Sequence, residues 1–392
     1  MNLPIYLDHH ATTPVDPEVL ETMLPALRGE FGNPASQSHP FGWRAQEIVD
    51  EARRTVAAFI GARSASEIIF TSGTTESNNL ALKGCLEALR LKTAHVITQT
   101  TEHKSVLEPC RYLETKGFQV TYLDVDSTGR VDPGALERAI RPETVILSIM
   151  LANNEIGTLQ PVEEIGRIAK KREIFFHVDA AQAAGKIPID VNQMGIDLLS
   201  FSAHKMYGPK GVGVLYARSE RPRVKLAPLF HGGGHEKGIR SGTLNVPAIA
   251  GLAKACEIAG RSMDEENRRV KSLRDRLEKA LLAGLGDAFV NGHPQHRLAG
   301  NLNISFLYIE PEALMAALQQ DLAVSASSAC SSGIPEASYV MKALGIDGQR
   351  THTALRFGIG RFNTAEEIDY AAERVIDAVK KLRKLSGLAP GS

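Results

Sequence analysis

Through the first two thirds of the chain, short runs rich in β-branched and aromatic residues alternate with amphipathic segments of helical length. Strands are predicted at residues 67–71, 95–99, 118–123, 144–150, 174–179 and 197–203, with helical segments such as 105–116 and 162–172 between them. This alternation is typical of a mainly parallel sheet covered by helices, because a parallel return needs a long crossover connection. The sequence therefore predicts an α/β fold whose ligands bind at the carboxyl ends of the strands.

The pattern changes near residue 256, which suggests a second, smaller domain. A charged helical pattern covers residues 264–283, the strand candidate NLNISFL follows, and a last helix is predicted at about 364–384. This later part is typical of a smaller α+β unit that packs with the N-terminal segment. We expect a large domain at 15–255 and a small domain made of 1–14 and 256–392.

The composition narrows the classes of partner. The 392 residues carry 45 basic and 45 acidic side chains, and 43% are hydrophobic, as in an ordinary globular protein. Without a basic excess or a polybasic run, neither nucleic acid nor anionic lipid is expected as a partner. No apolar run reaches about 18 residues, and the N-terminus lacks a basic stretch before an apolar segment, so we expect a cytoplasmic protein that acts on a small molecule.

Neither a disulfide framework nor a metal site is predicted. CxxC spacing is missing from the four cysteines, which are Cys85, Cys110, Cys256 and Cys330. Three glycines separate the histidines of HGGGH (231–235), which disfavours the helical spacing of a metal-binding pair, and His9-His10 has no partner cluster.

Four polar motifs follow directly after predicted strands. In SGTTES (72–77), a glycine turn meets Thr74, Thr75 and a glutamate at a helix start, which offers backbone N–H groups and hydroxyls to an anion. Alone, such a motif is more often a helix cap. The other three motifs are TEHKSV with His103, HVDAAQ with Asp179 and Gln182, and SAHK with Ser202, His204 and Lys205.

Taken singly, these side chains have ordinary readings, since lysine is usually solvated and a carboxylate or histidine at a strand end is often structural. Together they fit pyridoxal phosphate. Its aldehyde needs a lysine amine, its pyridine nitrogen needs a carboxylate, and its phosphate needs a helix start with hydroxyls. Lys205, Asp179 and the 72–77 turn supply these three groups.

The same residues carry a family resemblance. The motifs SFSAHKMYGPKG, HVDAAQ, SGTTESNN, TEHKSVL, ANNEIGT, GGGHEKGIRSGT and SSACSSG resemble the successive motifs of the cysteine desulfurases, from YLDHHATTPVDP to GRFNTAEEID. The resemblance implies a pyridoxal phosphate-dependent transferase of fold type I. Such a protein has a mainly parallel seven-stranded sheet with helices on both faces and a smaller α+β domain, and it works as a homodimer. The implied reaction removes sulfur from L-cysteine and leaves L-alanine and an enzyme-bound persulfide.

The resemblance also assigns roles to residues of the cofactor site. Lys205 holds the cofactor and then moves protons at the substrate α-carbon, Asp179 pairs with the ring nitrogen, and His103 stacks on the ring face. The remaining matches are Gln182 for the ring oxygen, Asn154 for a contact near the substrate, Thr75, Ser202 and His204 for the phosphate, and Thr243 for a phosphate contact from the other subunit. Thr74, where some relatives have alanine, is expected to bind the cofactor as part of the 72–77 turn.

Two further matches concern the substrate. Arg356 matches the arginine that pairs with the substrate carboxylate, while Arg361 is the structural alternative, which we expect to form a surface ion pair. Cys330 matches the nucleophile that takes the substrate sulfur, although an isolated cysteine is more often buried. Its segment SASSACSSGIP (325–335) is expected to be a mobile loop before a proline-initiated helix near residue 336.

Several alternatives stay open at this stage. A selenocysteine lyase or related carbon–sulfur lyase would need Cys330 less, a transaminase could use the same cofactor groups, and a non-catalytic relative would keep only the fold. The resemblance further implies a sulfur acceptor, such as an iron–sulfur scaffold. Housekeeping members carry a tail beyond the last helix, whereas this sequence ends at LSGLAPGS, so docking of a standard scaffold is left open.

Overall fold

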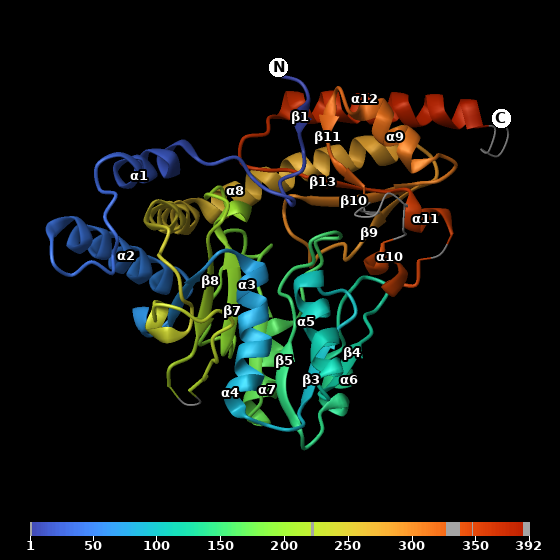
Figure 1. The fold of residues 1–392 in the computed structure, drawn as a ribbon. Coiled ribbons are helices and arrows are strands. Elements are labelled where there is room, and N and C mark those ends of the chain that lie inside the picture. Colours follow the sequence, from blue (N-terminus) through green and yellow to red (C-terminus); the bar gives the residue numbers. More distant parts are fainter. Residues whose placement is uncertain (1, 221–222, 327–337, 347, 387–392) are drawn as a thin grey trace.

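The computed structural model describes residues 2–220, 223–326, 338–346 and 348–386. Figure 1 shows a large sheet with its helices in the lower part of the view, and smaller sheets with α8, α9 and α12 above it. In the first part of the chain the helices are α1 (Pro17–Arg28), α2 (Pro40–Phe59), α3 (Thr74–Asn79), α4 (Cys85–Leu89), α5 (Lys104–Thr115), α6 (Pro133–Ala139) and α7 (Val162–Lys171). The later helices are α8 (Val246–Gly284), α9 (Pro311–Leu318), α10 (Tyr339–Ala343), α11 (Gln349–His352) and α12 (Ala365–Ser386).

The large sheet has seven strands in the order β2-β8-β7-β6-β5-β3-β4. Six of them confirm the predicted strands: β2 (Ile68–Thr71), β3 (His95–Gln99), β4 (Gln119–Leu123), β5 (Thr144–Ser148), β6 (Phe175–Asp179) and β7 (Leu198–Ser202). The seventh, β8 (Gly213–Ala217), was missing from the strand predictions; it follows the turn after Lys205 and runs antiparallel to β7 and β2. Because β8 alone is reversed, the carboxyl ends of the other six strands lie at one edge.

Both faces of the large sheet are buried, as the run of apolar residues in each strand predicts. Neighbouring residues within a strand point to opposite faces. Ile97 and Leu147 accordingly join one core with side chains of α2, α7 and α8, whereas Val96 and Ile146 join another with side chains of α4 and α5. Helices therefore cover both faces, and the sheet edge is left for ligands.

Another core, separate from the two on the faces of the large sheet, lies around the smaller sheets. One sheet has the order β12-β13-β10-β9, and the other pairs β1 (Ile5–Tyr6) with β11 (Leu322–Ala323). The strands are β9 (Ala288–Asn291), β10 (Asn301–Phe306), β12 (Ser325–Ala326) and β13 (Ala354–Gly358), and their apolar side chains pack against α9, α12 and the second half of α8.

Of three predictions about this region, one needs correction and two remain untested. The helix expected at 264–283 begins earlier, at Val246, so α8 runs through residue 256 and contributes both to a core of the large sheet and to the core of the smaller sheets. The division into 15–255 and 1–14 with 256–392 remains a prediction. The helix expected near residue 336 falls at the edge of the undescribed segment 327–337, and the described helix nearest to it is α10, capped by Ser338.

The N-terminal segment connects the smaller sheets to the large sheet. Its β1 pairs with β11, and Asp8 forms a bridge with Gly358 at the end of β13. Five residues further on, the backbone N–H of Thr13 donates to the carbonyl oxygen of His204, beside Lys205. Residues 5–13 therefore run from the small sheets to the edge of the large sheet. Within the described ranges, no helix is both long and apolar enough to cross a membrane.

Candidate active site

A cavity of about 650 Å³ opens at the carboxyl edge of the large sheet. The parallel strand direction explains its position, because the loops after β2, β3, β5, β6 and β7 all leave the sheet there. The N-terminal segment and Arg356 of β13 also line the cavity. The lining includes these predicted residues: Thr74, Thr75, His103, Asn154, Asp179, Gln182, Ser202, His204, Lys205 and Arg356.

The turn after β2 has the features of an anion cradle. The backbone N–H of Ser72 donates to Glu76 Oε2 at 2.8 Å, which holds the turn at the start of α3. The hydroxyl oxygens of Thr74 and Ser202 are buried and have no hydrogen-bond partner among the described residues. Buried hydroxyls normally have partners, so these two are suited to a ligand such as a phosphate.

A close backbone approach fixes this turn against β8. A Cβ atom at residue 213 would lie 2.6 Å from Cα of Gly73, closer than two carbon atoms can pack. Glycine at position 213 therefore lets the last pair of the β2–β8 ladder, Thr71 with Gly213, run directly into the turn.

Asp179 ends β6 at the floor of the cavity and is almost fully buried. Its Oδ2 accepts from Asn78 Nδ2 at 2.7 Å, and its Oδ1 accepts from the backbone N–H of Ala181 at 2.9 Å. Burial raises the pKa of this carboxyl, against the lowering effect of these bonds and of nearby cations. A cationic N–H in the cavity would compensate the buried charge, so Asp179 is suited to hold a proton on a ring nitrogen.

Lys205 follows β7 in a short helical turn. Its Nζ donates to the carbonyl oxygens of His10 and Ala11, at 2.6 Å each. Burial first, and then the positive charge of Arg356, lower the pKa of Lys205 to about 8. The site therefore makes a neutral, nucleophilic amine available near physiological pH.

The ring of His103 borders the cavity at the start of α5. Its Nδ1 accepts from the backbone N–H of Ser105 at 3.1 Å, so a neutral ring carries its proton on Nε2. Although the ring is open to the cavity, desolvation by the surrounding residues lowers the pKa of His103. The lowered pKa favours the neutral form. His103 can therefore offer an N–H or a ring face to a ligand.

Gln182 is held in one orientation by the N-terminal segment. Its Nε2 donates to the carbonyl oxygen of His10 at 2.8 Å, so Oε1 faces His10 Nδ1 at 3.1 Å and Lys186 Nζ at 3.4 Å. His10 Nδ1 is therefore the donor of that pair, which leaves His10 Nε2 as an acceptor. Burial lowers the pKa of His10 far below its usual value, and Nε2 has no partner among the described residues. His10 is thus a neutral acceptor in the cavity lining.

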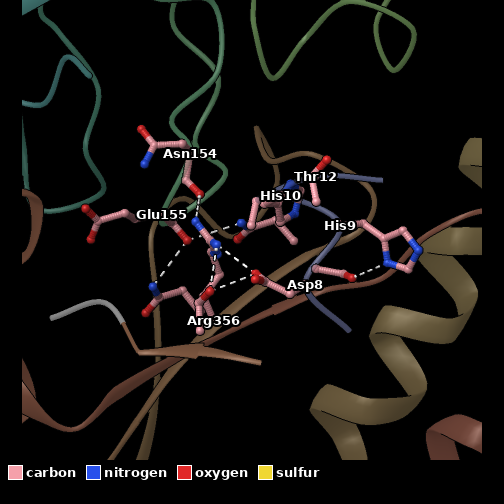
Figure 2. A network of polar contacts seen from close by, with 12 residues as sticks. Asp8, His9, His10, Thr12, Asn154, Glu155 and Arg356 are labelled. Atoms are coloured by element: carbon pink, nitrogen blue, oxygen red, sulfur yellow. Dashed lines mark hydrogen bonds and ion pairs between the residues drawn. The ribbon is translucent and has the colours of Figure 1, made fainter. Parts of the chain in front are cut away.

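Arg356 lies at the side of the cavity formed by β13 (Figure 2). Its Nη2 donates to Asp8 Oδ1 at 2.8 Å and to Ser325 Oγ at 3.0 Å, and its Nη1 donates to the backbone carbonyl of Asn154 at 2.9 Å. Arg356 and Asp8 keep only 11% and 18% of their side-chain surface exposed, so their ion pair is partly shielded from water. The guanidinium is therefore held in place at the cavity before any ligand binds.

Glu155 lies beside this network (Figure 2). Its side chain accepts from Ser338 Oγ at 2.6 Å, and burial raises its pKa to about 7. Glu155 therefore links the loop after β5 to the start of α10.

The structure brings most of the predicted site residues together, with two exceptions. Thr243 is exposed and does not line the cavity, and Cys330 lies outside the described residues. One expectation was wrong: Arg361 is not a surface partner, since its side chain is only 15% exposed and pairs with Asp16 at 2.6 Å and Glu266 at 2.8 Å.

The sequence reasoning missed the contribution of the N-terminal segment. His10 and Thr12 line the cavity, and Asp8 holds Arg356. His9-His10 had been considered only as a metal pair. The signal that could have found them is the motif YLDHHATTPVDP, which opens the family resemblance but was given no role.

Comparison with known proteins agrees with this geometry. The family described as "Aminotransferase class-V" matches residues 5–371. The chain belongs to the class-V aminotransferase family. Within the family, "Cysteine desulfurase IscS" of Tolumonas auensis is 56% identical over 390 residues, which cover 99% of this chain and 96% of the relative.

Solved structures of relatives show the same fold. A "NifS-like protein" superposes with a TM-score of 0.89 at 40% identity and covers 97% of this chain and 100% of its own. "SspA in complex with cysteine" has a TM-score of 0.79 at 36% identity and covers 92% of this chain and 99% of its own. The predicted fold class is confirmed: an α/β protein with a mainly parallel seven-stranded sheet.

Class-V aminotransferases depend on pyridoxal phosphate, and the cavity fits this cofactor. The unpartnered hydroxyls of Thr74 and Ser202 suit its phosphate, the buried carboxylate of Asp179 suits its ring nitrogen, and the amine of Lys205 suits its aldehyde. These four residues come from the ends of three strands, β2, β6 and β7, and converge on one cavity, as the cofactor requires.

Proposed function

We propose that the protein is a cysteine desulfurase that removes sulfur from L-cysteine, releases L-alanine and keeps the sulfur as a persulfide on Cys330. The observation that carries this proposal is the position of Arg356, which lines the same cavity as the cofactor-binding residues at the strand ends. An amino acid whose amine reaches Lys205 could therefore place its carboxylate on Arg356. Relatives that are named cysteine desulfurase over nearly the whole chain support the same substrate.

When bound, pyridoxal phosphate withdraws electrons from the bonds of the substrate α-carbon. Around it, Asp179 holds the proton of the ring nitrogen, and Gln182 offers an N–H to the ring oxygen from an amide fixed by His10. Lys205, whose pKa is lowered to about 8 in the ligand-free protein, would take and return a proton at the α-carbon.

Sulfur transfer then forms a bond between Cys330 Sγ and the substrate sulfur, and the substrate carbon–sulfur bond breaks. The electron pair of that bond stays with the substrate carbon, which takes up a proton and leaves as L-alanine. L-cysteine and one thiol are thus converted to L-alanine and one persulfide, and no outside oxidant is needed. Cys330 becomes reactive as its thiolate, which is a minor form of an ordinary cysteine at neutral pH.

The proposal includes a homodimer, with Thr243 reaching the phosphate in the partner's site. The exposed position of Thr243, outside its own cavity, supports this assignment. It also includes a cytoplasmic location and transfer of the sulfur to an acceptor protein, such as an iron–sulfur scaffold. Measurement of the solution mass tests the dimer, and loss of cofactor affinity in Thr243→Ala tests the contact between subunits.

The proposed function is tested with purified protein and L-cysteine. We expect an absorbance of the bound cofactor that changes when L-cysteine is added, and formation of L-alanine and sulfide in the presence of a reductant. Cys330→Ala should keep the spectral change and lose most of the turnover. Unimpaired turnover in Cys330→Ala would favour a lyase without a persulfide, and keto-acid-dependent pyruvate formation from L-alanine would favour a transaminase.

A further inference from the structure

A substrate carboxylate at Arg356 meets bonds that the guanidinium already makes. A guanidinium has five N–H donors, one on Nε and two on each of Nη1 and Nη2. Nη2 donates to both Asp8 and Ser325, and Nη1 donates once to the carbonyl of Asn154. Among the described residues, Nε has no partner. Nε–H and one hydrogen of Nη1 therefore have no acceptor among the described residues.

These two free donors cannot bind one carboxylate as a pair. Bidentate binding of a carboxylate uses two parallel N–H groups, and a guanidinium offers such pairs either at Nε with Nη2 or at Nη1 with Nη2. Both arrangements need a hydrogen of Nη2, which already has two acceptors, Asp8 Oδ1 and Ser325 Oγ. We infer that a substrate carboxylate binds Arg356 by displacing the Ser325 hydroxyl from Nη2. This inference rests on the proposed function, in which Arg356 is the carboxylate partner.

Ser325 is the weaker of the two competitors. Asp8 is charged and holds Nη2 in an ion pair of 2.8 Å, whereas the Ser325 hydroxyl is neutral and lies at 3.0 Å. Ser325 also keeps a second bond when it gives up the first, because its hydroxyl donates to Asp8 Oδ1 at 2.8 Å. Loss of the Ser325 contact therefore leaves no buried group unpartnered, while loss of the Asp8 contact would leave a partly buried carboxylate without its cation.

The fold places Ser325 where this exchange can occur. Ser325 is the direct cross-strand partner of Arg356 in the β12–β13 ladder, so its backbone stays fixed beside the guanidinium while its hydroxyl rotates. It is a positioning residue: it holds Arg356 in the free enzyme and lowers the affinity for the substrate carboxylate. Ser325 also lies five positions before Cys330 in the sequence.

The test is the equilibrium binding of L-alanine to the holoenzyme, followed through the cofactor absorbance. L-alanine carries the amine and carboxylate of the substrate but no sulfur, so binding is separated from sulfur transfer. In Ser325→Ala we expect L-alanine to bind about three- to tenfold more tightly, because one hydrogen bond no longer has to be displaced. Ser325→Thr, which keeps the hydroxyl, should bind L-alanine as the unaltered protein does. Ser325→Gly gives a second variant without the hydroxyl.

Cysteamine, which has the amine and thiol but no carboxylate, should bind equally to all these variants. Unchanged or weaker binding of L-alanine in both Ser325→Ala and Ser325→Gly would overturn the displacement. Arg356→Gln separates this failure from a failure of the proposed function. If Arg356→Gln binds L-alanine as well as the unaltered protein does, Arg356 is not the carboxylate partner, and the substrate site and the displacement both fall.

Discussion

The lowered pKa of Lys205 predicts how fast cofactor-free protein takes up pyridoxal phosphate at different pH values. Burial and the charge of Arg356 lower this pKa from the usual 10.5 to about 8. Only the neutral amine attacks an aldehyde. With a pKa of about 8, the neutral fraction is about 9% at pH 7 and about 91% at pH 9. With the ordinary pKa, the two fractions would be about 0.03% and about 3%.

The two cases differ in the shape of the pH profile as well as in its level. The uptake rate should rise about tenfold between pH 7 and pH 9 and level off above pH 9 if Lys205 has the lowered pKa. It should rise about a hundredfold without levelling off if Lys205 is an ordinary lysine.

The assay mixes cofactor-free protein with pyridoxal phosphate and follows the absorbance of the product over time. The cofactor itself titrates in this range, so the rates are divided by those of N-acetyl-lysine, an amine of ordinary pKa, under the same conditions. Between pH 7 and pH 9 this ratio should fall about tenfold if Lys205 has the lowered pKa, because the reference rate rises about a hundredfold and the protein rate about tenfold. In Arg356→Gln, the midpoint should move to higher pH, because one of the charges that lower the pKa is gone. A ratio that stays constant from pH 7 to pH 9 would refute this account of the lysine.

Three further predictions concern single positions. Asp179→Asn keeps the size of the side chain but loses its charge, so kcat should fall on the order of a hundredfold while the cofactor still binds, as steady-state kinetics and absorbance would show. Gly213→Val places a side chain against Gly73. We expect the free energy of unfolding to fall by about 1–3 kcal/mol and the cofactor to bind more weakly. An unchanged cofactor affinity would contradict the close approach of the two backbones. Burial lowers the pKa of His177 from 6.5 to about 3. Between these two pH values the unfolded chain binds a proton that the folded chain does not, so the free energy of unfolding falls as the pH falls. Between pH 7 and pH 5 the unaltered protein should therefore lose about 2 kcal/mol more than His177→Gln in urea unfolding of the cofactor-free form, and equal losses would contradict the shifted pKa.

The alternation of strands and helices was enough to predict the large sheet. Six strands lie within two residues of the predicted bounds, because each is a short apolar run bounded by polar turns. β8 was missed because it follows directly on the turn after Lys205, and nothing in an apolar run of five residues reveals an antiparallel partner. The early start of α8 was missed because its first half is buried and lacks the charged face that marked residues 264–283.

The cofactor side of the cavity could also be predicted, since one rule places the ends of parallel strands together. Lys205, Asp179 and the turn at 72–77 all follow that rule. The contribution of Asp8 and His10 could not be predicted in the same way. They reach the cavity through pairing of the N-terminal segment with β11 and β13, more than 300 positions away, and periodicity carries no information about such contacts.

The most direct test of the account is the mass of the peptide that contains Cys330 after the holoenzyme has been mixed with L-cysteine and then treated with an alkylating reagent. We predict a gain of one sulfur atom on Cys330, formed together with L-alanine and not formed in Lys205→Ala. Formation of L-alanine by the unaltered protein without any sulfur adduct on Cys330 would contradict the account.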